Sequence, residues 1–105
     1  GSGFNGQSFA FLGYLPIDAG ERAKKFKEIE HNIRVNDQTQ VFIETPYRNN
    51  KLIEEMSRIL PRQLMMCVAS DITGPKESII TRSINDWAKS KYDYDKVPTI
   101  FLLYK

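Results

Sequence analysis

Two charged segments, 44–48 and 71–77, each follow an apolar run and contain the residue types best suited to chemistry in this sequence. In open α/β sheets, ligands gather beyond the carboxyl ends of strands, where loops and helix starts expose backbone groups. A carboxylate and a cation at such a place either fix a ligand or form a local ion pair, and residue type alone leaves both interpretations open. The side chains concerned are Glu44, Thr45, Arg48, Asp71 and Thr73.

Other residues that often carry catalysis are few, because the chain has one Cys and one His. Cys67 lies inside an apolar run and is predicted to be a small core residue. His31 lies on the polar side of a predicted helix and is interpreted as a solvated side chain. A single Cys excludes an intrachain disulfide, and no glycine-rich dinucleotide loop, P-loop or HExxH helix occurs. We therefore predict no catalytic residue and no metal ligand in this chain.

Length and composition predict a single globular domain of ordinary size. The chain has 105 residues, 41% of them hydrophobic, and a net charge of +2, which is too small to indicate nucleic acid or a membrane surface. No apolar run approaches the roughly 20 residues of a membrane helix, so we expect a cytoplasmic protein without a membrane partner. Residues 1–7 are rich in Gly, Ser and Asn and are predicted to be disordered or tag-derived. The domain is expected to span 8–105.

Three amphipathic segments are predicted to be helices. The first helix begins after its N-cap Asp18 and ends at 36–37. The second begins after its N-cap Thr45 and ends at Pro61, and the third is short and begins after its N-cap Ser83. The residues expected to face the core are Phe26, Ile29 and Ile33 in the first helix, and Leu52, Ile53, Met56, Ile59 and Leu60 in the second.

Five runs are predicted to be strands: 9–12, 39–43, 64–69, 78–82 and 98–104. The run 64–69 is apolar throughout, which predicts a central strand covered on both faces. Helical crossovers favour parallel neighbours, whereas the short link between the third and fourth strands favours an antiparallel pair. The predicted fold class is therefore α/β, with a mixed five-stranded sheet and flanking helices.

Five segments also carry patterns that occur together in one enzyme family. They are GYLP followed by ER in 13–22, VFIETPYR in 41–48, DIT followed by E in 71–77, the short helix ending in Trp87, and VPTIFLL in 97–103. Together they resemble motifs of the tetrapyrrole (corrin/porphyrin) methylase superfamily. The segment 41–48 is similar to the "VFYESPHR" motif of its ribosomal RNA small-subunit methyltransferase I branch.

The resemblance covers only the second domain of that family. It implies the C-terminal domain of an S-adenosylmethionine-dependent methyltransferase, with the cofactor held mainly by an N-terminal domain that is absent here. It further implies a homodimer and, in the full-length enzyme, methylation of a ribose 2′-hydroxyl in ribosomal RNA. The fragment alone is expected to be inactive, and its expected partners are its own N-terminal domain, a second copy and ribosomal RNA.

The same resemblance assigns two groups of site residues. The cofactor-binding group lies at the end of the second predicted strand and the start of the last: Ile43, Glu44, Thr45, Pro98 and Thr99. The group on the acceptor side, or supporting its loop, is Arg48, Asp71 and Thr73.

Two alternatives stay open for the function. The chain is either a domain of a corrin or porphyrin methyltransferase, or a non-catalytic binding or dimerisation module that shares the fold. Tyr47 and Ser70 stand where the RNA branch has His and Arg, which leaves the acceptor undecided. An exposed apolar patch where another domain docks favours a fragment of an enzyme, whereas a fully polar surface favours the module.

Overall fold

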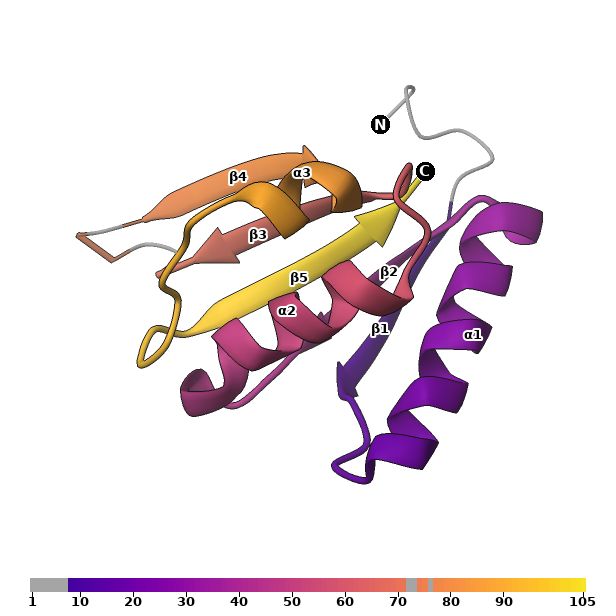
Figure 1. Cartoon of the computed structure of the whole chain (residues 1–105), viewed down its shortest axis with the longest axis horizontal. Coiled ribbons are helices and arrows are strands. Elements are labelled where there is room, and N and C mark those ends of the chain that lie inside the picture. The colour runs from indigo at the N-terminus through magenta and orange to yellow at the C-terminus, as the bar shows by residue number, and fades with distance from the viewer. Residues whose placement is uncertain (1–7, 72–73, 76) are drawn as a thin grey trace.

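A mixed five-stranded sheet organises the computed structural model, which describes residues 8–71, 74–75 and 77–105. The strand order is β1-β2-β5-β3-β4 (Figure 1). β1 (Ser8–Tyr14) is parallel to β2 (Gln38–Ile43), and β5 (Thr99–Tyr104) is antiparallel to β2 and to β3 (Met65–Ser70). β4 (Ser78–Ser83) is antiparallel to β3. The predicted α/β class and mixed sheet are confirmed, while the prediction for residues 1–7 lies outside the described residues.

Three α-helices connect the strands: α1 (Ala19–Asn36), α2 (Asn49–Ile59) and α3 (Ile84–Lys89). The predicted N-caps of α1 and α3 are confirmed, because Asp18 Oδ2 accepts from the Glu21 N–H at 2.9 Å and Ser83 Oγ accepts from the Asp86 N–H at 3.1 Å.

The entry into α2 differs from the prediction. The chain passes through a 3-10 turn, η2 (Pro46–Arg48), before the α-helix begins, and the Thr45 side chain makes no capping hydrogen bond. Proline does occupy the first helical position, where its missing N–H leaves no hydrogen bond unmade.

All three helices pack on one face of the sheet, where they bury a single core (Figure 1). The predicted core faces of α1 and α2 are confirmed except at Ile59, the last residue of α2, which is 48% exposed. The rings of Phe42 and Phe101 stack at the centre of the sheet with centroids 5.6 Å apart. Helix residues that contribute to this core are Phe26, Ile29, Ile33, Leu52, Ile53, Met56, Ile84 and Trp87.

The other face of the sheet carries no helix among the described residues and is largely apolar. The strand register places ten of its side chains in two rows that cross all five strands, and we call these rows the open face. Phe11, Tyr14 and Ile79 are 70%, 63% and 63% exposed, respectively. The first row is Phe11, Val41, Leu102, Cys67 and Thr81, and the second is Tyr14, Ile43, Ile100, Ala69 and Ile79.

The open face overturns two predictions about the run 64–69. β5 is the central strand, and β3 is second from the edge with helices on one side only. Cys67 is half-buried on the open face instead of lying in the core. An apolar run cannot distinguish a strand covered on both faces from one whose uncovered face is itself apolar, and this is why the prediction failed.

Candidate functional site

A cavity of about 270 Å³ lies at the end of β2 and the start of β5, and we call it the strand-end cavity. It is next to the open face, because Ile43 pairs with Tyr14 on one side and with Ile100 on the other. Four of the five residues predicted to bind a cofactor line it together, whereas Thr45 is exposed and is not among the lining residues. The full lining is Tyr14, Ile43, Glu44, Pro46, Pro98, Thr99 and Ile100.

Tyr14 reaches this cavity because β1 extends further than predicted. The sequence indicated a turn beginning at Gly13, but the strand continues through a register shift between Phe11 and Gly13. Gly13 has φ +71°, a left-handed conformation that glycine adopts without the usual steric cost. This irregularity sets Tyr14 opposite Ile43, which sequence alone did not show.

The residues predicted to lie on the acceptor side, Arg48, Asp71 and Thr73, do not lie together, and only two of them are described. The Asp71 N–H donates to the Pro98 carbonyl at 2.9 Å, so the start of the 71–77 segment adjoins the strand-end cavity without lining it. Thr73 lies outside the described residues. Arg48 lines a different cavity on the helix side of the sheet.

Asn49 holds the wall of the strand-end cavity in place and was missed in the sequence. Its side chain is fully buried, and Nδ2 lies 2.9 Å from the Tyr94 carbonyl, 2.8 Å from the Val97 carbonyl and 3.0 Å from Thr99 Oγ1. Its Oδ1 is buried without a hydrogen-bond partner among the described residues. A polar residue at the start of a helix is ordinarily expected to be exposed to solvent. Asn49 is buried because the long loop before β5 folds over the start of α2.

The neighbouring Asn50 strengthens the same attachment. Its backbone N–H donates to Asp95 Oδ1 at 3.0 Å, and its own Oδ1 accepts from the Tyr94 N–H at 2.8 Å. The Lys96 N–H also donates to the Pro46 carbonyl at 2.9 Å. The segment preceding Pro98 is therefore fixed to the start of α2 by several hydrogen bonds, which preorganises the cavity wall.

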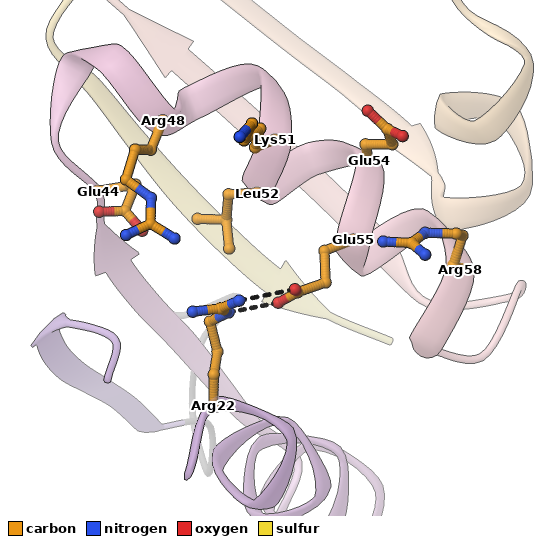
Figure 2. A pocket seen from close by; sticks show the side chains of 8 residues that line it. All are labelled: Arg22, Glu44, Arg48, Lys51, Leu52, Glu54, Glu55 and Arg58. Carbon is orange, nitrogen blue, oxygen red and sulfur yellow. Dashed lines mark hydrogen bonds and ion pairs between the residues drawn. The ribbon is translucent and has the colours of Figure 1, made fainter. Parts of the chain in front are cut away.

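A second cavity, of about 330 Å³, lies between the start of α1 and α2, and we call it the charged cleft (Figure 2). Glu44 lines this cleft as well as the strand-end cavity, so the two are adjacent. The lining is Arg22, Glu44, Arg48, Lys51, Leu52, Glu54, Glu55 and Arg58.

A bidentate ion pair forms one wall of the charged cleft. Arg22 Nε and Nη2 donate to the two carboxylate oxygens of Glu55 at 2.5 and 2.8 Å, and Nη1 donates to the Ile17 carbonyl at 2.8 Å. The hydrogen bond from Arg22 holds the pKa of the Glu55 carboxyl below its ordinary value, against the opposing effect of burial. The same bond raises the pKa of Arg22.

The local ion pair considered for Glu44 and Arg48 does not form in the described structure. Both side chains line the charged cleft (Figure 2), but no nitrogen–oxygen contact within 4.0 Å joins them. Instead, the Thr45 N–H donates to Glu44 Oε1 at 2.8 Å. The Arg48 guanidinium is thus left facing the cleft.

Within the described parts of the chain, no three His, Cys, Asp or Glu side chains gather as a metal site requires. None of the described helices is long and apolar enough to cross a membrane. His31 is exposed, as predicted.

No protein-family profile and no curated protein matches the sequence, but solved structures do. The methyltransferase CobJ superposes with a TM-score of 0.58 at 15% identity, over 93% of this chain and 41% of CobJ. Uroporphyrin III C-methyltransferase from Thermus thermophilus gives 0.53 at 16% identity, over 92% of this chain and 40% of that one. A protein described as a diphthine synthase from Entamoeba histolytica gives 0.50 at 9% identity, over 90% and 42%.

These likenesses show a shared fold. Nearly all of this chain corresponds to about two-fifths of each related structure. Two of the three are methyltransferases by name, in agreement with the family that the sequence motifs resemble, and none of the three names refers to RNA. The fold implied by the resemblance is confirmed.

Proposed function

We propose that this chain is the C-terminal domain of an S-adenosylmethionine-dependent methyltransferase of the tetrapyrrole methylase superfamily. The observation that carries the proposal is the strand-end cavity, because Ile43, Glu44, Pro98 and Thr99 belong to motifs up to 56 positions apart and line one cavity. The fold shared with two structures of methyltransferases supports it.

The strand-end cavity suits one part of the cofactor. Tyr14, Ile43 and Ile100 offer apolar surface for a planar base, while the Glu44 carboxylate suits ribose hydroxyls or a cationic group. At about 270 Å³ the cavity is slightly below the roughly 300 Å³ at which small-molecule pockets usually begin. It therefore supplies one wall, and a second domain must supply the other.

The open face supports the presence of that second domain. Its second row runs from Tyr14, Ile43 and Ile100 at the cavity to Ala69 and Ile79, so a domain packed on it would also close the cavity. Large exposed apolar patches mark such docking surfaces in proteins. This favours a domain of a larger enzyme over a self-contained binding module, with a homodimer as the proposed assembly.

When bound, the cofactor would supply an electrophilic methyl group on its sulfonium, and the neutral thioether would be the leaving group of an in-line displacement. The residues of this chain bind and orient rather than react: Glu44 holds a polar group, the apolar lining excludes water, and Asn49 keeps the Pro98–Thr99 wall in position. As the acceptor we propose a ribose 2′-hydroxyl of ribosomal RNA, on the motif at 41–48. A tetrapyrrole is the alternative.

The test uses the full-length gene product with labelled S-adenosylmethionine, offered undermethylated small ribosomal subunits and, in parallel, uroporphyrinogen. Label in RNA is the expected result. Label in the tetrapyrrole would keep the family and replace the acceptor, and absence of cofactor binding would overturn the proposal.

Variants locate the cofactor site. Glu44→Gln should weaken cofactor binding by about tenfold, whereas Glu28→Gln, on exposed helix surface, should leave it unchanged. The isolated chain should bind the cofactor at millimolar concentration or more weakly, about −4 kcal/mol. Submicromolar binding by this chain alone would contradict the shared-site proposal.

A further inference from the structure

The side chains of three cations of the charged cleft make no direct polar contact in the described structure. Those of Arg48, Lys51 and Arg58 form no hydrogen bond and no ion pair within 4.0 Å with a described residue. They lie on one side of η2 and α2 at spacings of three and seven residues, which places successive side chains on the same helix surface.

Four cations and three carboxylates line the cleft, so its net charge is +1. Both oxygens of Glu55 accept from Arg22, and Glu44 accepts from the Thr45 N–H, so neither carboxylate is hydrogen-bonded to the other three cations. Figure 2 shows Glu54 turned away from the Arg22–Glu55 pair. After the Arg22 hydrogen bond, which is the largest cause, the charges of Arg58 and Arg48 also help to lower the pKa of Glu55.

We infer that the charged cleft is a binding subsite for oxyanion groups, phosphate or carboxylate, carried by the methyl acceptor, with Arg48 and Arg58 as the principal ligands and Lys51 as a third. A guanidinium presents five N–H donors in a planar fork that fits such groups bidentately.

Size and position both support this assignment. Lys51 and Arg58 are seven residues apart in α2, roughly 10 Å along the helix axis, which is enough for more than one anionic group. Glu44 borders both the charged cleft and the strand-end cavity, so an acceptor held here would have its reacting part directed toward the proposed cofactor wall. The identity of the ligand as the methyl acceptor rests on the proposed function. The binding of anions by the cleft does not.

The test is a titration of this chain with inorganic pyrophosphate, followed by the NMR signals of the backbone and of the arginine side chains. We expect shifts confined to 44–58 and to the Nε–H groups of Arg48 and Arg58. Arg48→Gln and Arg58→Gln should each weaken binding roughly fivefold, and both together by more than tenfold. Lys27→Gln removes the same charge from exposed surface of α1 and should change binding by less than twofold.

Competition then identifies the source of the anion. Displacement of pyrophosphate by an eight-nucleotide RNA supports the subsite as a phosphodiester site, and displacement by uroporphyrin supports it as a carboxylate site. Displacement by neither, or an equal effect of Lys27→Gln and Arg58→Gln, would overturn the inference. Cofactor binding by the full-length protein is measured separately, so failure of the subsite and failure of the proposed methyltransferase function give different results.

Discussion

Arg22 and Glu55 join the start of α1 to the middle of α2 through two parallel hydrogen bonds of 2.5 and 2.8 Å. Their side chains are only 9% and 21% exposed, so the pair is shielded from water and from salt. The remaining guanidinium nitrogen donates to the Ile17 carbonyl, which fixes the loop that leads into α1. This one arginine therefore sets the separation of the two helices that enclose the charged cleft.

Glu55→Gln should lower the free energy of unfolding by about 2 kcal/mol at pH 7, between the values for exposed and fully buried ion pairs. The loss arises because Arg22 would stay buried without a charged partner. Urea unfolding followed by circular dichroism measures it. The neighbouring Glu54→Gln, on exposed surface, should stay within about 0.5 kcal/mol of the parent, and an equal effect of the two variants would contradict this role.

The same pair predicts a pH dependence of stability. Because the pKa of Glu55 is lower in the folded chain than in the unfolded one, its contribution is complete above the unfolded pKa and is lost as pH falls through the folded pKa. The stability gap between the parent and Glu55→Gln should therefore narrow as pH falls below the ordinary pKa of a glutamate, about 4.3. If the difference in free energy of unfolding between the parent and Glu55→Gln stays constant as the pH is lowered, the carboxylate charge of Glu55 is not the source of the stabilisation.

Asn49→Ala should destabilise the chain by about 2 kcal/mol, since the Tyr94 and Val97 carbonyls each lose one of two donors. The Tyr94 carbonyl keeps only the Val97 N–H at 3.3 Å, and the Val97 carbonyl keeps the Thr99 hydroxyl at 2.9 Å. It should also weaken cofactor binding by the full-length protein, because the Pro98–Thr99 wall loses its attachment to α2. Thermal unfolding and calorimetric titration test the two effects. The matched control is Asn85→Ala on α3, whose side chain makes no hydrogen bond in the described structure.

The open face predicts that the isolated chain binds the dye ANS and self-associates at high concentration. Phe11→Lys and Ile79→Lys should reduce both by placing charge on this apolar surface, with little loss of stability because the replaced side chains are 70% and 63% exposed. Fluorescence and analytical ultracentrifugation are the measurements. Ile17→Lys removes a still more exposed isoleucine, 81% exposed, away from the sheet, and a decrease as large as that of Ile79→Lys would argue against a specific patch.

Trp87 is the only tryptophan and is fully buried, so its emission should be blue-shifted in the folded chain and move to longer wavelength on unfolding. Its Nε1–H donates to the Met66 carbonyl at 2.9 Å, and the Arg82 guanidinium lies 4.9 Å from the ring centroid. Trp87→Phe should cost about 2 kcal/mol through the lost hydrogen bond and the lost volume. Tyr47→Phe, at an exposed position, should leave the thermal midpoint unchanged in the same circular-dichroism scan.

Local signals in the sequence were sufficient for most of the elements. Asp18 and Ser83 cap their helices as predicted, because an N-cap depends only on residues within one turn. The bulge at Gly13 and the 3-10 entry to α2 were missed, since each depends on how a neighbouring strand or loop packs.

In the candidate site, too, some residues can be predicted from local motifs and others depend on tertiary contacts. Motif resemblance identified Ile43, Glu44, Pro98 and Thr99, which the structure brings together around one cavity. Tyr14 and Asn49 were not identified, because the first depends on strand register and the second on a loop 45 residues away.

The positions of most helices and strands, and the polar residues that follow the strands, can be read from the sequence, because periodicity, caps and turn residues act over a few positions. Three features appear only in the folded chain: β5 lies between β2 and β3, one face of the sheet stays open, and the Arg22 side chain is paired with Glu55 while those of Arg48 and Arg58 are not. These features depend on contacts between residues far apart in the chain, and side-chain type alone carries no record of which partner is reached.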